Sequence, residues 1–170
     1  MEGAVWKEKL LEALMRLGES GHTTAGFLRA HKTRISFWKV RKNVGAFWTM
    51  FGTIHFNSLH YSYKSDIADI RLLTLLIHEV KHLQQGFLLA LSVYGELEAW
   101  QLQFRLYHQL TDRQPHPAIA ELLSLPLIYD RAVLKKAVTL MQAYAGKGYR
   151  ANLLPLYPLG QEIKYWLTRR

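Results

Sequence analysis

The residues best suited to chemistry lie in the pentad His78-Glu79-Val80-Lys81-His82, at the end of a largely apolar run. Residues four apart on a helix lie on one face, about 5–6 Å from each other, so both imidazoles can reach one zinc ion. The Glu79 carboxylate projects from an adjoining strip, where it can hold a water molecule and take its proton. The pentad therefore predicts a zinc-binding helix over about residues 66–86.

A helical wheel at 100° per residue separates the polar side chains of this helix from its apolar ones. One narrow stripe collects the polar residues Arg71, Thr74, His78, Lys81, His82 and Gln85. Glu79 falls outside this stripe among leucines, where a carboxylate is costly unless it is paired or used. The alternative is a helix whose histidines fall four apart by chance, with Glu79 as a solvated charge.

A third metal ligand is expected from the next helical segment, because a catalytic zinc ion normally takes three protein ligands. On the helix predicted at about residues 95–110, Glu96 lies at the centre of an apolar arc, whereas Glu98 lies on the opposite, polar face. A metal would neutralise a carboxylate that faces the core. Glu96 is therefore the predicted ligand and Glu98 the second choice, while His55 and His60 remain possible.

Together these residues resemble a zincin metallopeptidase of the gluzincin type, in which a His-Glu-x-x-His helix precedes a helix that brings a glutamate. Glu96-Leu97-Glu98-Ala99 is similar to the Glu-x-x-Ala signature of several bacterial gluzincin-like families, although Trp100 stands where they usually carry Asp or Asn. The resemblance covers about residues 54–110. It implies a zinc-dependent hydrolase of peptide bonds, with Zn2+ on His78, His82 and Glu96 and with Glu79 as general base.

The same resemblance implies a place for an extended peptide substrate, since zincins pair it with the edge strand of a sheet. The segment Ile54-His55-Phe56 precedes the zinc helix and is the predicted substrate-binding edge, with an ordinary internal strand as the alternative. An oxyanion donor is also expected. The sequence leaves it open among Tyr94, Tyr107, Tyr129, Tyr149 and Arg150.

At 170 residues and 49% hydrophobic, the chain favours a single domain with a real core. The pattern of expected helices and strands predicts an α+β fold, and the resemblance implies one zincin-like metallopeptidase domain over residues 1–170. Cysteine is absent, which excludes disulfides and thiolate metal sites. The first residues lack the layout of a signal peptide, and no apolar run approaches the roughly 20 residues that cross a membrane. These features predict a cytoplasmic protein without a membrane span.

The net charge of +9 favours polyanionic partners, including a possible weak contact with nucleic acid through a basic surface. Aromatic residues flank the basic segment 39–42, namely Phe37, Trp38, Phe47 and Trp48. They could form a stacking platform for single-stranded nucleic acid, or they could face the protein's own core. Two other functions therefore compete with the peptidase: an inactive zincin-like domain that binds metal or protein, and a basic nucleic-acid-binding protein.

The remaining patterns predict a small, mostly antiparallel sheet packed on helices. Strands are expected at 35–41, 46–51 and 54–63, and further helices at 4–17, 117–125, 127–144 and 161–168.

Overall fold

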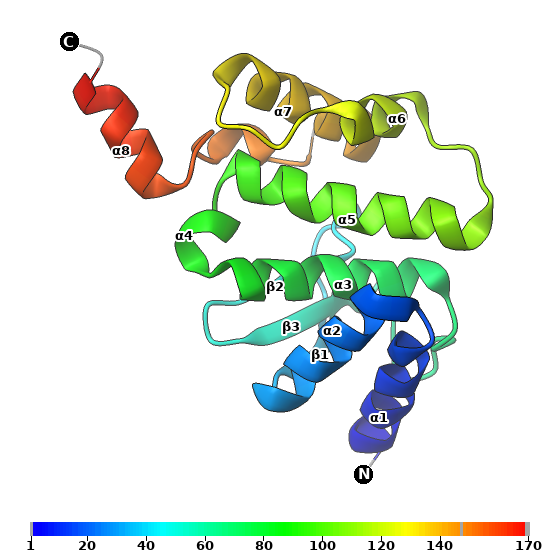
Figure 1. Cartoon of the computed structure of the whole chain (residues 1–170). Helices are drawn as coiled ribbons and strands as arrows, with labels where there is room; N and C mark the ends of the chain where they lie inside the picture. Colours follow the sequence, from blue (N-terminus) through cyan, green and yellow to red (C-terminus); the bar gives the residue numbers. More distant parts are fainter. Residues whose placement is uncertain (1, 147, 169–170) are drawn as a thin grey trace. The chain divides into compact units, whose positions relative to one another are not determined.

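The computed structural model describes residues 2–146 and 148–168 and has an α+β fold, as predicted (Figure 1). Its helices are α1 (Glu2–Met15), α2 (Gly18–Ala30), α3 (Ile70–Gln85), α4 (Phe87–Ala90), α5 (Val93–Thr111), α6 (Pro117–Ser124), α7 (Arg131–Ala145) and α8 (Leu159–Thr168), with a 3-10 turn, η1 (Ala151–Leu153). Its strands are β1 (Arg34–Trp38), β2 (Ala46–Trp48) and β3 (Thr53–Asn57).

The chain divides into two compact units, an N-terminal unit up to Leu83 and a C-terminal unit from Gln84 onward. The sheet belongs to the N-terminal unit, and the helices from α4 to α8 belong to the C-terminal unit. A single zincin-like domain over residues 1–170 stays a prediction.

The sheet of the N-terminal unit has the strand order β1-β3-β2. β3 pairs in parallel with β1 and antiparallel with β2, so the sheet is mixed where a mostly antiparallel one was predicted. The prediction that Ile54, His55 and Phe56 form an edge strand is wrong, because β3 has a neighbour on each side. Its main-chain hydrogen bonds are therefore used within the sheet, and β1 and β2 are the edges.

Helices cover one face of this sheet and form the core of the N-terminal unit. Ile54 and Phe56 on β3 are fully buried, and the Trp6 ring of α1 lies 5.4 Å from that of Phe37 and 6.5 Å from that of Phe56. α1 and α2 approach so closely that a Cβ on Gly21 would lie 1.9 Å from the Leu14 carbonyl oxygen. Only glycine fits this helix crossing.

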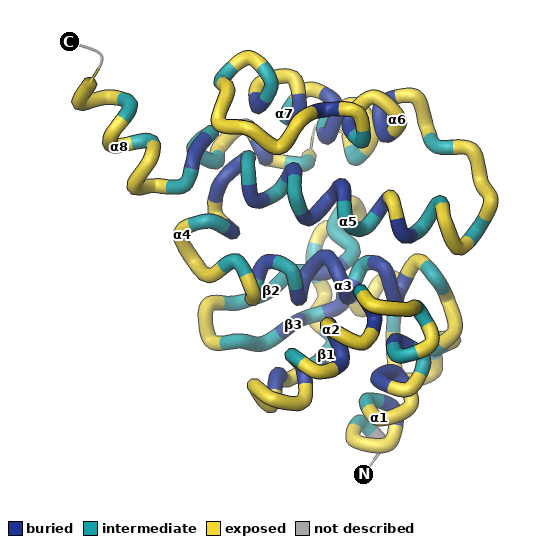
Figure 2. Tube along the Cα trace, in the orientation of Figure 1, coloured by how far each residue is buried: buried dark blue, intermediate teal, exposed yellow. Residues whose placement is uncertain are grey.

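The C-terminal unit is built around α5, which packs against α6 and α7. Its core includes Leu97, Trp100 and Phe104 of α5 with Leu134 and Met141 of α7. Helix α8 has no buried residue, and Figure 2 shows no dark blue segment along it. Helix α8 is therefore attached through side chains that remain partly exposed to solvent.

One such contact centres on Arg131 at the start of α7. Its Nη1 lies 2.8 Å from the Glu162 carboxylate, and its guanidinium lies 4.4 Å from the centre of the Tyr165 ring. Both partners belong to α8. An ion pair and a cation–π contact therefore attach this helix to α7.

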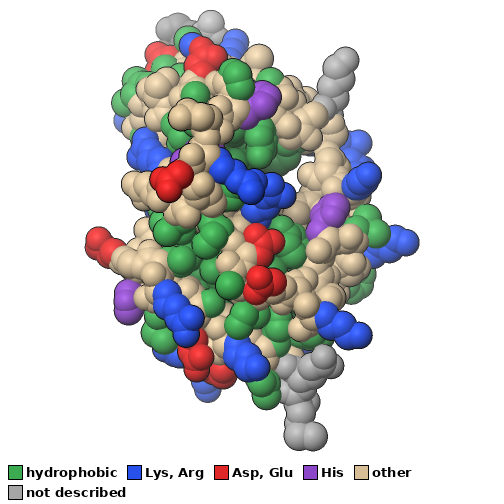
Figure 3. All heavy atoms as spheres, turned by 90° about the vertical axis from the view of Figure 1, so that its right-hand side faces the viewer, with side chains coloured by type: hydrophobic (Ala, Val, Ile, Leu, Met, Phe, Trp, Pro, Cys, Tyr) green, Lys and Arg blue, Asp and Glu red, His purple; other side chains and the backbone are tan. Residues whose placement is uncertain are grey.

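The charged surface is consistent with the basic composition. Figure 3 shows blue Lys and Arg side chains spread over one face of the molecule, with red Asp and Glu and green hydrophobic side chains between them. Over the residues that the structure describes, no helix has both the length and the apolar character needed to cross a membrane.

Candidate metal centre

Helix α3 places the predicted histidines and begins where its sequence offers a cap. Asp69 accepts a hydrogen bond from the Arg71 N–H at 2.9 Å, as an N-terminal capping residue does. Gly86 follows the helix with a positive φ of +74°, a conformation that favours glycine. The observed helix, Ile70–Gln85, thus lies within the predicted range of 66–86.

His78 and His82 come together on α3, as their spacing predicts. Their Nε2 atoms lie 3.1 Å apart and their ring planes meet at 80°. Two nitrogens that bind one tetrahedral zinc ion at about 2.05 Å each lie about 3.3 Å from each other. The separation therefore suits two nitrogens on one metal ion as well as a hydrogen bond between the rings, and both residues are buried.

Glu79 is buried on the same helix, with 4% of its surface exposed. The wheel predicted this burial from its place among leucines. A buried carboxylate is costly unless it has a partner or a task. Its position next to His78 in the chain is consistent with the role of general base, which itself stays a prediction.

The sheet supports the histidine end of α3 through β2. The Trp48 ring lies 6.0 Å from the His82 ring, with 31° between the two planes. A Cβ on Gly45 would lie 2.9 Å from a methyl group of Leu75, so the chain approaches α3 closely just before β2 begins. Trp48 was expected either in a stacking platform or against the protein's own core, and this contact supports the second.

Glu96 lies in the first turn of α5 in the C-terminal unit. Ser92 caps this helix, since its Oγ accepts the Gly95 N–H at 3.0 Å. The Glu96 Oε2 accepts hydrogen bonds from the Trp100 Nε1, at 3.2 Å, and from the Tyr149 hydroxyl. The Trp100 Nε1 also lies 2.8 Å from the Tyr149 hydroxyl oxygen. Three side chains thus form a closed hydrogen-bonded group on one carboxylate oxygen.

Trp100 stands where gluzincin-like families usually carry Asp or Asn. Its indole carries an N–H donor and no acceptor, so it donates to the Glu96 carboxylate and cannot accept a hydrogen bond from a histidine. Tyr149, one of the candidate oxyanion donors, donates to Glu96 as well. Hydrogen bonds of this kind orient a ligand carboxylate. The sequence offered no signal for the Tyr149 contact, which spans 53 residues.

Glu98, the second choice, has a different environment. Its Oε2 accepts a hydrogen bond from the Gln85 Nε2 at 2.9 Å, and the same amide donates to the Gly95 carbonyl at 3.0 Å. Gln85 ends α3 and Gly95 lies in the first turn of α5. Glu98 thus takes part in the connection between the end of α3 and the start of α5.

The predicted donor set consists of two imidazoles on α3, from His78 and His82, and one carboxylate on α5, from Glu96. Nitrogen and oxygen donors in this number suit zinc. The chemistry of the donors fits the metal that the resemblance implies, while the identity of the metal stays a prediction.

The other candidate histidines have local roles. His55 Nδ1 lies 2.7 Å from the Ser36 Oγ, and His60 Nε2 lies 2.6 Å from the Lys42 carbonyl oxygen. Neither contact indicates a metal ligand, and both are ordinary hydrogen bonds of a side chain with a neighbouring strand or loop.

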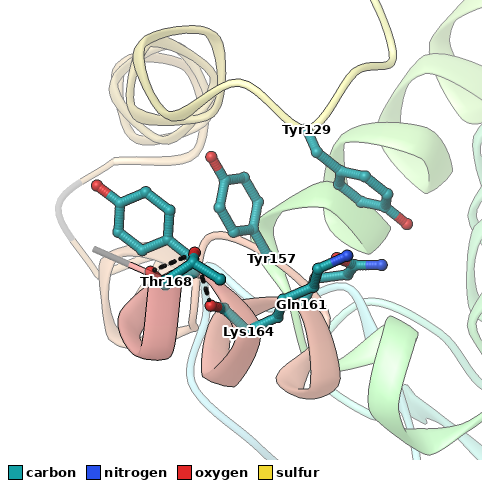
Figure 4. A pocket seen from close by; sticks show the side chains of 6 residues that line it. Tyr129, Tyr157, Gln161, Lys164 and Thr168 are labelled. Atoms are coloured by element: carbon teal, nitrogen blue, oxygen red, sulfur yellow. Dashed lines mark hydrogen bonds between the residues drawn. The ribbon is translucent and has the colours of Figure 1, made fainter. Parts of the chain in front are cut away.

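A pocket of about 220 Å³ lies in the C-terminal unit, beside α8. Figure 4 shows Tyr129, Tyr157, Gln161, Lys164 and Thr168 around it, with the Thr168 hydroxyl turned back to main-chain carbonyls of its own helix. Burial raises the pKa of Tyr157 above its ordinary value, so this phenol stays protonated at neutral pH. Tyr129, one of the candidate oxyanion donors, lines this pocket, whereas Glu79 and the predicted metal ligands do not.

No family model, curated protein or solved structure matches this chain. The resemblance to gluzincins is therefore carried by the pentad on α3 and the Glu-x-x-Ala motif on α5.

Proposed function

We propose that this protein is a zinc-dependent metallopeptidase whose metal is held by His78, His82 and Glu96. The observation that carries the proposal is the pair of buried Nε2 atoms 3.1 Å apart on α3, next to the buried Glu79 carboxylate. A peptide or protein is the proposed substrate. When bound, zinc would lower the pKa of a water molecule and polarise the scissile carbonyl.

The protein's own groups then have separate tasks. Glu79 takes a proton from the attacking water as the new C–O bond forms, and delivers it to the amine nitrogen as the peptide C–N bond breaks. Trp100 and Tyr149 hold one oxygen of the Glu96 carboxylate, which leaves its other oxygen for the metal. This arrangement supports Glu96 as an oriented ligand.

Metal content is the first test, measured by mass spectrometry on tag-free protein purified without added metal. We expect about one zinc ion per chain, lost in His78→Ala/His82→Ala. The matched control is His22→Ala/His31→Ala, because both of these histidines are exposed on the same unit. Equal metal content in the two variants, or none in the wild type after titration with zinc, would contradict the proposal.

Hydrolysis is tested separately, with a peptide library and detection of new termini. Glu79→Gln should lower kcat/KM by about 10²–10⁴-fold and leave the zinc content unchanged, while Glu12→Gln, at an exposed position, should leave both unchanged. Zinc binding without cleavage of any peptide would instead favour the inactive zincin-like domain.

A further inference from the structure

The three strands of the N-terminal unit separate their side chains into two faces. The register pairs Ile35 with Ile54, and Trp48 with Ile54 on the other side, so these residues share the face that helices cover. Ser36, His55 and Phe47 are paired with each other in the same way and share the opposite face. The aromatic residues around the basic segment are thus divided between a covered face and an open one.

The open face carries a row of rings. The Phe47 ring is stacked on the His55 ring with 4.9 Å between centres and 21° between planes. The Trp38 ring meets His55 edge-on at 6.0 Å and is 62% exposed. Phe47 and His55 are half-buried. Partly exposed aromatic rings on a sheet can offer faces on which unpaired bases stack.

The basic loop between β1 and β2, residues 39–45, is hydrogen-bonded to Asn57 at the end of β3. Asn57 is fully buried, and its side-chain amide donates to the carbonyls of Arg41, at 2.9 Å, and Val44, at 2.7 Å. Its Oδ1 accepts the Val40 N–H at 3.3 Å. Asn57 lies two residues after His55 on β3, so both residues belong to the same face of the sheet. The exposed side chains of Arg41 and Lys42 are therefore carried by a loop held at this end of the sheet.

The charge of this region has one sign. Between Glu19 and Asp66 the sequence contains seven Lys and Arg residues and neither Asp nor Glu. One of them, Arg34, begins β1 and is exposed. Burial and the nearby Arg34 charge both lower the pKa of His55 below 6.5, so its ring is neutral at pH 7 and offers a surface for stacking.

We propose that this open sheet face binds single-stranded nucleic acid, with Trp38 and Phe47 stacking on bases and Arg41 and Lys42 contacting phosphates. A single strand suits this surface because its unpaired bases expose their ring faces, whereas the bases of a duplex are stacked on each other. RNA and DNA should bind alike, since stacking and phosphate contacts do not require a 2′-hydroxyl. This activity is independent of the proposed peptidase.

The test is fluorescence anisotropy of the full-length chain with labelled 12-nucleotide oligo(U) and oligo(dT), and with a duplex of the same length. Trp38→Ala should weaken binding of both single strands about 5- to 100-fold, and Trp38→Phe should restore most of it. The matched control is Trp166→Ala, because Trp166 is 56% exposed on the other unit. Arg41→Ala/Lys42→Ala should reduce the dependence of log K on log salt by about 0.7 for each lost phosphate contact.

Three outcomes would overturn the proposal. Single strands and duplex could bind equally with no effect of Trp38→Ala, which would mean diffuse charge attraction alone. Binding to anionic phosphatidylserine vesicles without binding to either oligonucleotide would assign the surface to a membrane. If neither the oligonucleotides nor the vesicles bind at 50 mM salt, then this face does not bind a polyanion. Because zinc content and peptide cleavage are separate readouts, each result is distinguishable from failure of the proposed peptidase.

Discussion

Helices α3 and α5 carry the two parts of the proposed donor set and hold their side chains in different ways. On α3, the helix itself brings the Nε2 atoms of His78 and His82 to 3.1 Å from each other. On α5, the Glu96 carboxylate is held by Trp100, one turn away, and by Tyr149, which is 53 residues distant in the sequence. A chelating pair can thus be built by local geometry, whereas an oriented carboxylate needed a contact from another segment.

The largest expected effect comes from removing the carboxylate on α5. Glu96→Ala should lower zinc affinity more than a hundredfold, because loss of a direct ligand should exceed the 10–100-fold cost of losing a supporting group. Glu98→Ala should leave zinc affinity nearly unchanged and cost about 1 kcal/mol of stability through the lost Gln85 hydrogen bond. Competition titration with a chromogenic zinc chelator measures both affinities. A greater loss in Glu98→Ala would reverse the assignment of the third ligand.

The next effect concerns the support of that carboxylate. Tyr149→Phe removes the hydroxyl that donates to Glu96 and accepts from Trp100. We expect zinc affinity to fall about 10–100-fold, with a loss of stability of about 1–2 kcal/mol.

The control for this variant is Tyr129→Phe, whose side chain is half-exposed in the same unit. Zinc titration and chemical denaturation are measured on both. If Tyr149→Phe lowers stability and leaves zinc affinity unchanged, then Tyr149 has a packing role only and Glu96 loses its support as a ligand.

Helix periodicity explains what the sequence predicted well. The apolar run and the polar stripe are local features, so the existence of α3 and the meeting of His78 and His82 followed from them. The predicted helix over 95–110 corresponds to α5, Val93–Thr111, for the same reason. Glu79 was expected among leucines, and it is buried.

The predictions that failed concern the order of the strands and the ends of β3 and of the first helix. Alternation identified β3 as a strand, but strand pairing depends on the whole chain, and β3 inserts between β1 and β2. Residues 54–63 were expected to form one strand, yet β3 ends at Asn57, whose side chain is used to hold the preceding loop. The helix expected at 4–17 ends at Met15, and a second helix, α2, begins directly afterwards at Gly18 with a φ of +70°. Sequence patterns describe local preference, and none of these features is local.

The smallest effect concerns α8 in the C-terminal unit, which an ion pair and a cation–π contact attach to α7. Burial raises the pKa of Glu162, but the hydrogen bonds from Arg131, the Tyr157 N–H and Trp166 outweigh it, so the pKa lies below its ordinary value of 4.5. A carboxylate with a depressed pKa stabilises the folded state fully above its unfolded pKa. Its contribution is lost as the pH falls below 4.5 and through the lower folded value.

Hydrogen exchange measured between pH 6 and pH 3, corrected for intrinsic rates, should therefore show α8 opening at low pH before α3 does. Glu162→Gln should remove this pH dependence in α8 and cost about 1 kcal/mol at pH 6. Glu121→Gln is the matched control, because Glu121 pairs with Lys136 at 2.6 Å while about half of each side chain is exposed, and solvent screens such a pair. Equal loss of protection in α3 and α8 would mean that acid acts on the whole chain, and that Arg131 and Glu162 do not control the attachment of α8.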